Sequence, residues 1–417
     1  MSLFDLVTLL LGLSALLGWV NFRFIGLPSS IGMLVMGLVA SLLLVAVDLA
    51  APSEPLHRQV AAAVATIDFA EAVMDGMLAF LLFAGALHLD FSALRGRAWP
   101  VAVMATAGVV ISTAVIGVGI WQLSGFVGVP IALPWALVFG ALVSPTDPVA
   151  VLGILAAVRV PKALETDMKG ESLFNDGVGV VVFSLLLGVA VGAQTGVAEV
   201  ASLFVHEAVG GVVVGLVMGT IVVQMTRQVD DYALEVMLSV ALAAGTYALG
   251  RALHTSGPIA VVVAGLLLGN RGARVGMSAS TRRHVFSFWD VVDYALNALL
   301  FLLIGLEVLV LRVDAGFAWL GAIAVVLALA GRAAAVGISV TLVRRWVDMV
   351  PGTIAVLTWG GLRGGISIAL VLSLPEVAEK PALLAATYAV ALFTLLVQGS
   401  TLGWVARRVT RPAAAGG

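Results

Sequence analysis

The chain has 417 residues, of which 61% are hydrophobic and only 11% charged, and its formal net charge is −2. These proportions lie far outside those of soluble proteins and indicate a polytopic membrane protein. The lack of cysteine excludes disulfides, thiolate metal sites and cysteine nucleophiles. The sequence has no basic tract and no zinc-type spacing, so nothing in it points to a nucleic-acid partner.

Apolar segments follow one another along the whole chain. A helix needs ~20 apolar residues to cross the hydrocarbon layer. Segments that approach this length lie at 3–20, 26–49, 70–89, 100–124, 132–157, 169–192, 201–225, 232–250, 257–269, 285–311, 316–343, 352–374 and 381–405. We therefore expect an all-α fold of about thirteen transmembrane helices, forming a single transport domain over residues 1–417 with no soluble domain.

The charge of the loops predicts how the chain is oriented. Alternate loops are rich in arginine, namely Arg95, Arg97, Arg271, Arg274, Arg282, Arg283, Arg344, Arg345, Arg407 and Arg408. The other loops carry acidic residues such as Glu199, Glu376 and Glu379. The positive-inside rule then puts the C-terminus in the cytoplasm and the N-terminus outside, as an odd number of spans requires.

The fifth and twelfth segments are both interrupted. Pro145 and Pro148 remove backbone donors from the fifth, and Gly361 and Gly364 lie beside Arg363 in the twelfth. If spans 1–6 and 8–13 form two repeats, the odd seventh span makes the second repeat inverted and the two breaks equivalent. Matched breaks in inverted repeats are typical of a transporter's binding site. The two breaks therefore indicate where the binding site lies.

Polar side chains gather around the first break and in the following span. Thr146 and Asp147 lie in the break, and Ser172 and Asp176 share one helix face four residues apart. A carboxylate at bilayer depth costs roughly 2.5–3.5 kcal/mol, so it is kept only where it is paired or exposed to water. Such hard oxygens suit a small cation or the proton that replaces it. Asn175 is interpreted either as a ligand or as a helix-packing hydrogen-bond donor.

Two further groups of charged residues fall within predicted spans. Arg363 needs a partner, Glu171 or Asp147, because a buried guanidinium cannot lose its proton. We favour Glu171, which would make Glu171–Arg363 a structural ion pair. Arg332 in span eleven has no evident partner and is interpreted as structural or pathway-lining. Asp290 and Asp293 begin span ten and are expected at the interface, with Asp293 a candidate to line a vestibule.

Three motifs resemble those of bacterial NhaP-type Na⁺/H⁺ antiporters, members of the electroneutral branch of the cation:proton antiporters with an NhaA/NhaP-like fold. They are Ser144-Pro-Thr-Asp-Pro148, Gly170-Glu-Ser-Leu-Phe-Asn-Asp-Gly-Val178 and Gly361-Leu-Arg-Gly-Gly-Ile-Ser367. The resemblance implies a homodimer whose core bundle, spans 4–6 and 11–13 (roughly 100–192 and 316–405), moves against a dimerisation part. That part comprises spans 1–3 and 7–10 (roughly 3–89 and 201–311).

The resemblance also assigns roles to single residues. Asp176 matches the aspartate that carries the ion or the proton, and Ser172 and Thr146 match its companions at a Na⁺ site. Asn175 matches the asparagine of the electroneutral branch, and Asp147 matches the aspartate of the unwound helix. These correspondences follow from the motifs quoted above.

The same resemblance assigns Glu171 and Arg363 to a buried ion pair, and it exposes one departure. Many members have a glutamate in span three where this chain has Ala84, within Leu82-Phe83-Ala84-Gly85. That glutamate contributes to the ion site in some relatives. The preference among Na⁺, Li⁺ and K⁺ is therefore left open.

The functional hypothesis is electroneutral exchange of one Na⁺ for one H⁺ by competition at Asp176, with alternating access and a role in pH homeostasis. No cofactor and no enzymatic activity are expected. The expected partners are the substrates Na⁺ and H⁺ and the lipid bilayer in which the protein lies. One alternative is a transporter for another small solute, such as a carboxylate, coupled to H⁺ or Na⁺. A remote alternative is an intramembrane aspartyl protease, whose two aspartates would share a proton.

Overall fold

The computed structural model describes residues 3–50, 69–147, 151, 158, 160–192, 197–307 and 315–409. Every regular element within these ranges is a helix, and they contain no strand, so the predicted all-α fold is confirmed. Ten of the described helices are long and apolar enough to cross a membrane. Shorter apolar stretches of helix cover Ser29–Leu43, which is part of a longer helix, and Leu133–Val143.

The first half of the chain forms mostly long helices joined by short turns. They are α1 (Leu3–Val20), η1 (Asn21–Ile25), α2 (Ser29–Ala50), α4 (Phe69–Glu71), η2 (Ala72–Met77), α5 (Leu78–Leu87), α6 (Phe91–Gly96), α7 (Ala98–Ala105), α8 (Ala107–Leu123), η3 (Ser124–Val127), α9 (Leu133–Val143) and α11 (Lys162–Ala190). The π-helical η2 continues directly into α5, so these two elements cover the predicted third span.

The second half contains the longest helices. They are α12 (Val197–Thr226), α13 (Tyr232–Ala252), α14 (Gly257–Leu267), η4 (Leu268–Gly272), α15 (Ala273–Val275), α16 (Ala279–Glu307), α17 (Ala315–Val343), α18 (Thr353–Trp359), α19 (Gly365–Leu372), α20 (Lys380–Phe393), η6 (Thr394–Gln398) and α21 (Gly399–Val409). Each of the thirteen predicted apolar segments contains helix in the structure. The number of membrane crossings stays a prediction, because the described helices of segments five and twelve are short.

The predicted fourth span contains a local distortion that the sequence analysis did not find. Helix α7 ends at Ala105 and α8 begins at Ala107, but backbone hydrogen bonds of 3.1 Å from Thr106 N–H to the Ala102 carbonyl and from Val110 N–H to the Thr106 carbonyl continue across the junction. Between them the Thr106 hydroxyl donates a hydrogen bond of 2.6 Å to the Ala102 carbonyl one turn earlier. A threonine that bonds back in this way competes with the backbone ladder and bends helices.

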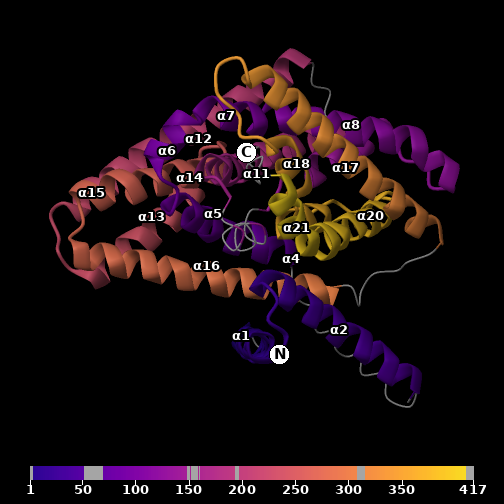
Figure 1. The fold of residues 1–417 in the computed structure, drawn as a ribbon, viewed down its shortest axis with the longest axis horizontal. Coiled ribbons are helices and arrows are strands. Elements are labelled where there is room, and N and C mark those ends of the chain that lie inside the picture. Colours follow the sequence, from indigo (N-terminus) through magenta and orange to yellow (C-terminus); the bar gives the residue numbers. More distant parts are fainter. Residues whose placement is uncertain are drawn as a thin grey trace, which may run out of the picture.

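The helices pack into two groups that α11 connects (Figure 1). In one group α8 packs against α9 and α17, and α17 packs against α20. In the other group α14 packs against α5, α12 and α13, while α16 packs against α5 and α13. Helix α11 contacts α9 and α7 in the first group and α14 and α12 in the second. Helices α1 and α2 lie beyond α16 at the edge of the molecule (Figure 1).

The outer surface of α12 is apolar, as a lipid-facing helix requires. Val205, Val209 and Val213 follow each other at intervals of four residues, and each side chain is more than half exposed. Residues at this spacing lie on one helix face. An apolar exposed face of this kind is typical of a membrane-spanning helix.

Candidate functional site

The two interrupted helices meet at their breaks. Helix α9 ends at Val143 and no helix follows as far as Asp147, while α18 ends at Trp359 and α19 begins at Gly365. The Asp147 backbone N–H donates a 2.8 Å hydrogen bond to the Leu362 carbonyl, which joins the two breaks directly. The predicted breaks at Pro145 and around Gly361 and Gly364 are thus present. Pro148 and most of the following stretch lie outside the described residues.

A glycine makes this crossing possible. A Cβ atom added to Gly364 would lie 2.2 Å from Oδ2 of Asp147, well inside van der Waals contact. On the opposite side, a Cβ atom at Gly179 of α11 would lie 2.3 Å from Cγ of Pro145. The unwound chain of the fifth span therefore passes between two glycines, and this explains how backbone segments approach so closely here.

Arg363 binds the carbonyl groups that the first break releases. Its Nη1 donates to the carbonyl oxygens of Ser144 at 2.6 Å and of Pro145 at 2.9 Å. Its own backbone N–H donates to the Thr394 hydroxyl at 3.1 Å, and the side chain is only 1% exposed. These are the carbonyls at the C-terminal end of α9, where a positive charge is favourable.

The predicted ion pair between Glu171 and Arg363 is wrong. Glu171 is paired instead with Arg332 of α17, which donates through Nη1 to Oε1 and through Nη2 to Oε2, the latter at 2.7 Å. The Nε of Arg332 donates to the Leu357 carbonyl at 3.0 Å. The bidentate geometry matches a planar guanidinium to a carboxylate, and Arg363 is already engaged with backbone carbonyls. The available signal was Arg332 itself, a buried cation for which the sequence offered no partner.

Thr146, Ser172 and Asn175 form one hydrogen-bonded cluster between the break and α11. The Thr146 and Ser172 hydroxyls lie 3.0 Å apart, and the Asn175 amide donates to the Thr146 hydroxyl at 2.9 Å. The Asn175 carbonyl accepts the Thr146 backbone N–H at 3.2 Å. All three side chains are at most 3% exposed. Asn175 therefore orients Thr146 through both ends of its amide group.

Asp176 lies beside this cluster but differs from it in having no partner. Its side chain is 5% exposed, and within the described residues its carboxylate makes no hydrogen bond and no ion pair. A buried carboxylate without such contacts is costly unless it binds a cation or a proton. Ser172 and Thr146 bond to each other rather than to Asp176.

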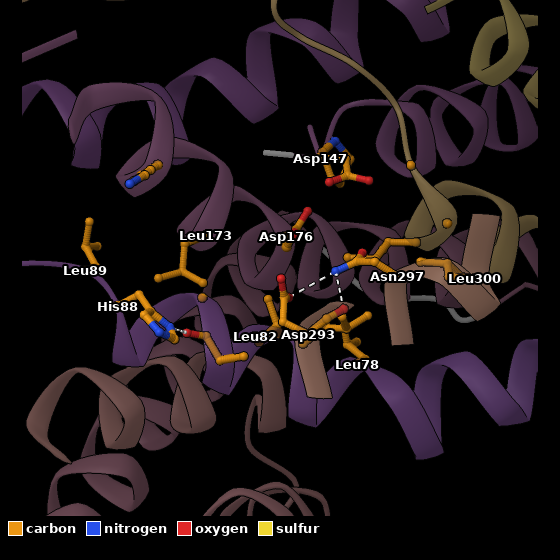
Figure 2. Close-up of a pocket in the computed structure, with 18 of the residues that line it drawn as sticks. Leu78, Leu82, His88, Leu89, Asp147, Leu173, Asp176, Asp293, Asn297 and Leu300 are labelled. Atoms are coloured by element: carbon orange, nitrogen blue, oxygen red, sulfur yellow. Dashed lines mark hydrogen bonds between the residues drawn. The ribbon is translucent and has the colours of Figure 1, made fainter. Parts of the chain in front are cut away.

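Asp176 lies at the wall of a cavity of about 260 Å³ (Figure 2). Asp147 also lines this cavity, so both predicted site aspartates reach the same space. The small residues Ala84 and Gly85 of α5 also line it. The cavity also reaches Asp293 of α16, the residue that the sequence suggested for a vestibule.

At its other end the cavity reaches residues that are open to solvent. His88 and Asp290 both line it, and their side chains are 35% and 68% exposed. Their Nε2 and Oδ1 atoms lie 3.0 Å apart. The cavity therefore connects the exposed ends of α5 and the α16 segment around Asp290 with the buried carboxylate of Asp176.

Comparison with known proteins identifies the family. The sodium/hydrogen exchanger transmembrane family matches residues 12–408. The chain belongs to this family. It is 47% identical to the Na⁺/H⁺ antiporter NhaP of Pseudomonas aeruginosa over 416 residues, which cover 97% of this chain and 96% of that protein. It is 40% identical to the Na⁺/H⁺ antiporter NhaH of Halobacillus dabanensis, over 80% of this chain and 82% of the relative.

The fold also matches the solved structure of a sodium proton antiporter. The sodium proton antiporter MjNhaP1 from Methanocaldococcus jannaschii superposes with a TM-score of 0.75 at 18% identity, over 98% of this chain and 99% of that one. This likeness supports the fold alone. The NhaP-type resemblance of the three motifs is confirmed by the family match and the relatives, and the chain is a multi-pass membrane protein of a transporter family.

Proposed function

We propose that this chain exchanges Na⁺ for H⁺ across the bacterial inner membrane. The observation that carries the proposal is Asp176, a carboxylate at the buried end of a cavity that reaches solvent and without a hydrogen-bond partner in the described residues. Family membership and the names of the relatives support the same activity. No cofactor and no enzymatic step are part of this function.

The charges around the breaks support an exchange of one cation for one proton. The site contains the carboxylates of Asp147, Glu171 and Asp176 and the guanidinium groups of Arg332 and Arg363. Three carboxylates against two guanidiniums leave one formal negative charge when all are ionised. One Na⁺ or one H⁺ neutralises it, so either can occupy the site and each excludes the other.

The same charge explains why transport is coupled. Moving an uncompensated carboxylate through an apolar barrier is costly. The helix bundle therefore switches the site from one side of the membrane to the other only when Asp176 carries Na⁺ or a proton. Protonation removes the attraction for Na⁺ and releases it on one side, and deprotonation restores it on the other. Net charge movement is zero in this cycle, and exchange is electroneutral.

The Na⁺ ligands that we propose are the Asp176 carboxylate and the hydroxyls of Thr146 and Ser172, with Asp147 beside them. Asn175 is the positioning residue, since it binds both the hydroxyl and the backbone N–H of Thr146. Hard oxygen atoms of this kind suit Na⁺. The Glu171–Arg332 pair is structural and stabilises the start of the segment that carries these residues.

The orientation and the moving parts are also proposals. Arginines Arg274, Arg282 and Arg283 line a depression that shares His88 with the mouth of the cavity. The positive-inside rule puts this face in the cytoplasm, so the cavity opens inward, with the N-terminus outside. We assign the group of α8, α9, α11, α17 and α20 to a moving core, and the group around α14 and α16 to the scaffold of a homodimer. Two inverted repeats relate the breaks.

Reconstitution into liposomes tests this function. A Na⁺ gradient imposed on vesicles with the unaltered protein should drive a change in internal pH that needs no counter-ion movement. Asp176→Asn keeps the shape of the side chain and removes its proton, and it should abolish this exchange. Asp230→Asn, in the exposed turn between α12 and α13, is the matched control and should leave it unchanged. Exchange that persists in Asp176→Asn would reject the assignment.

A further inference from the structure

Helix α16 carries a polar stripe that lines the cavity. Asp290, Asp293 and Asn297 follow each other at intervals of three and four residues, which places them on one helix face. All three line the same cavity as Asp176 (Figure 2). The stripe therefore runs from the exposed mouth, where Asp290 lies, toward the buried carboxylate of Asp176.

Asn297 fixes the carboxylate in the middle of this stripe. Its Nδ2 donates to Oδ1 of Asp293 at 3.0 Å and to the Asp293 carbonyl at 2.9 Å. In the described residues no ion pair and no other hydrogen bond engages the Asp293 carboxylate, so its second oxygen is available to a ligand. Asp293 and Asp176 line the same cavity (Figure 2).

Asp290 and Lys169, the other charged residues at this end of the cavity, each have a partner. Oδ1 of Asp290 lies 3.0 Å from Nε2 of His88, while Nδ1 of His88 lies 2.8 Å from the Ala84 carbonyl. The imidazole is thus held between two oxygen atoms. Lys169 also lines the cavity, but its ammonium group pairs with Glu165 at 2.6 Å.

We propose that Asp293, positioned by Asn297, is a second cation site on the entrance side, from which Na⁺ passes to Asp176. Between Asp290 at the exposed end and Asp176 at the buried end, the Asp293 carboxylate has an oxygen that no described residue engages. The cavity of about 260 Å³ that all three line can hold a cation with some of its water. This inference rests on the proposed exchange of Na⁺ for H⁺.

The chemistry of the two sites is complementary. Asp176 is 5% exposed, and its carboxylate has no partner among the described residues, so it accepts a cation that has lost most of its water. Asp293 is half-buried and still reaches the wetter part of the cavity. A cation that binds first at Asp293 and then at Asp176 therefore loses its water in two steps. Each step has a smaller free-energy cost of dehydration than a single transfer from solvent to Asp176.

The test compares Asp293→Asn with Asp290→Asn, a removal of the same charge from the same helix face nearer the mouth. Initial Na⁺-driven exchange is measured in reconstituted liposomes over a range of Na⁺ concentrations. A charge in contact with a cation in water contributes about a factor of five to affinity. We expect Asp293→Asn to raise the KM for Na⁺ about fivefold or more with the maximal rate retained, and Asp290→Asn to raise it less.

Two additions make the result decisive. Asp293→Ser serves as a second variant, and excess choline chloride screens long-range attraction without occupying a Na⁺ site. A KM increase that persists in choline chloride supports a contact site. An unchanged KM, an equal increase in Asp290→Asn, or an increase that disappears in choline chloride overturns the inference. If Asp176→Asn is inactive while Asp293→Asn behaves like the unaltered protein, this inference alone fails; activity of Asp176→Asn rejects the proposed function itself.

Discussion

The pairing of Glu171 with Arg332, rather than with Arg363, makes a quantitative prediction. Glu171 is fully buried and receives two N–H bonds from Arg332, whose side chain is 6% exposed. Replacing Glu171 by Gln leaves the guanidinium buried without its counter-charge. Breaking a buried pair by removing one partner costs about 3–5 kcal/mol. We expect Glu171→Gln and Arg332→Gln each to lower the free energy of unfolding by about this amount.

A double-mutant cycle separates the two possible partners. Unfolding is followed by titration with a denaturing detergent for the single variants, for Glu171→Gln/Arg332→Gln, and for Glu171→Gln/Arg363→Gln. Removing both members of the true pair leaves no unpaired charge, so the double variant with Arg332→Gln should be more stable than the sum of the single losses predicts. The pairing described here would be refuted if the stability losses of Glu171→Gln and Arg332→Gln were additive while those of Glu171→Gln and Arg363→Gln were not.

Two further predictions concern the crossing point. A Cβ at Gly364 would lie 2.2 Å from Oδ2 of Asp147, so Gly364→Ala should abolish exchange. Gly188→Ala is the control and should retain exchange, because nothing lies within 4 Å of the added atom. Normal exchange by Gly364→Ala would contradict the close crossing. Thr146→Val removes the hydroxyl that contacts Ser172, and loss of one such ligand should raise the KM for Na⁺ about tenfold. An unchanged KM in that variant would remove Thr146 from the site.

Much of the fold was predictable because membrane helices are strongly constrained by length and composition. The glycines around Arg363 predicted a broken helix, and the structure has a break at that place. Pro145 did the same for the end of α9. Backbone groups in lipid must be satisfied locally, so residues that prevent helix leave a clear mark on the sequence.

The identity of the ion-pair partners was not predictable in the same way. Which arginine reaches Glu171 depends on how α17 crosses α11, and no local pattern encodes that crossing. Arg363 and Arg332 both lie in apolar segments and differ only in the groups that surround them in three dimensions. The distortion at Thr106 was missed for a related reason, since a single hydroxyl bonded to its own helix has no signal in hydropathy.

The contribution of α16 was only partly foreseen. The spacing of Asp290 and Asp293 near the start of an apolar segment indicated an interfacial pair. It did not show that the helix continues from Ala279, so that Asp293 lies well inside the helix and reaches the cavity of Asp176. Polar residues at the start of a long helix are easily interpreted as loop.

Proton release on Na⁺ binding tests the central claim most directly. Purified protein in weakly buffered detergent solution, at a pH low enough to protonate Asp176 without Na⁺, is titrated with Na⁺ while the pH is recorded. The account predicts release of about one proton for each Na⁺ bound, and none in Asp176→Asn. Sodium binding that releases no proton, or the same release from Asp176→Asn, would contradict it.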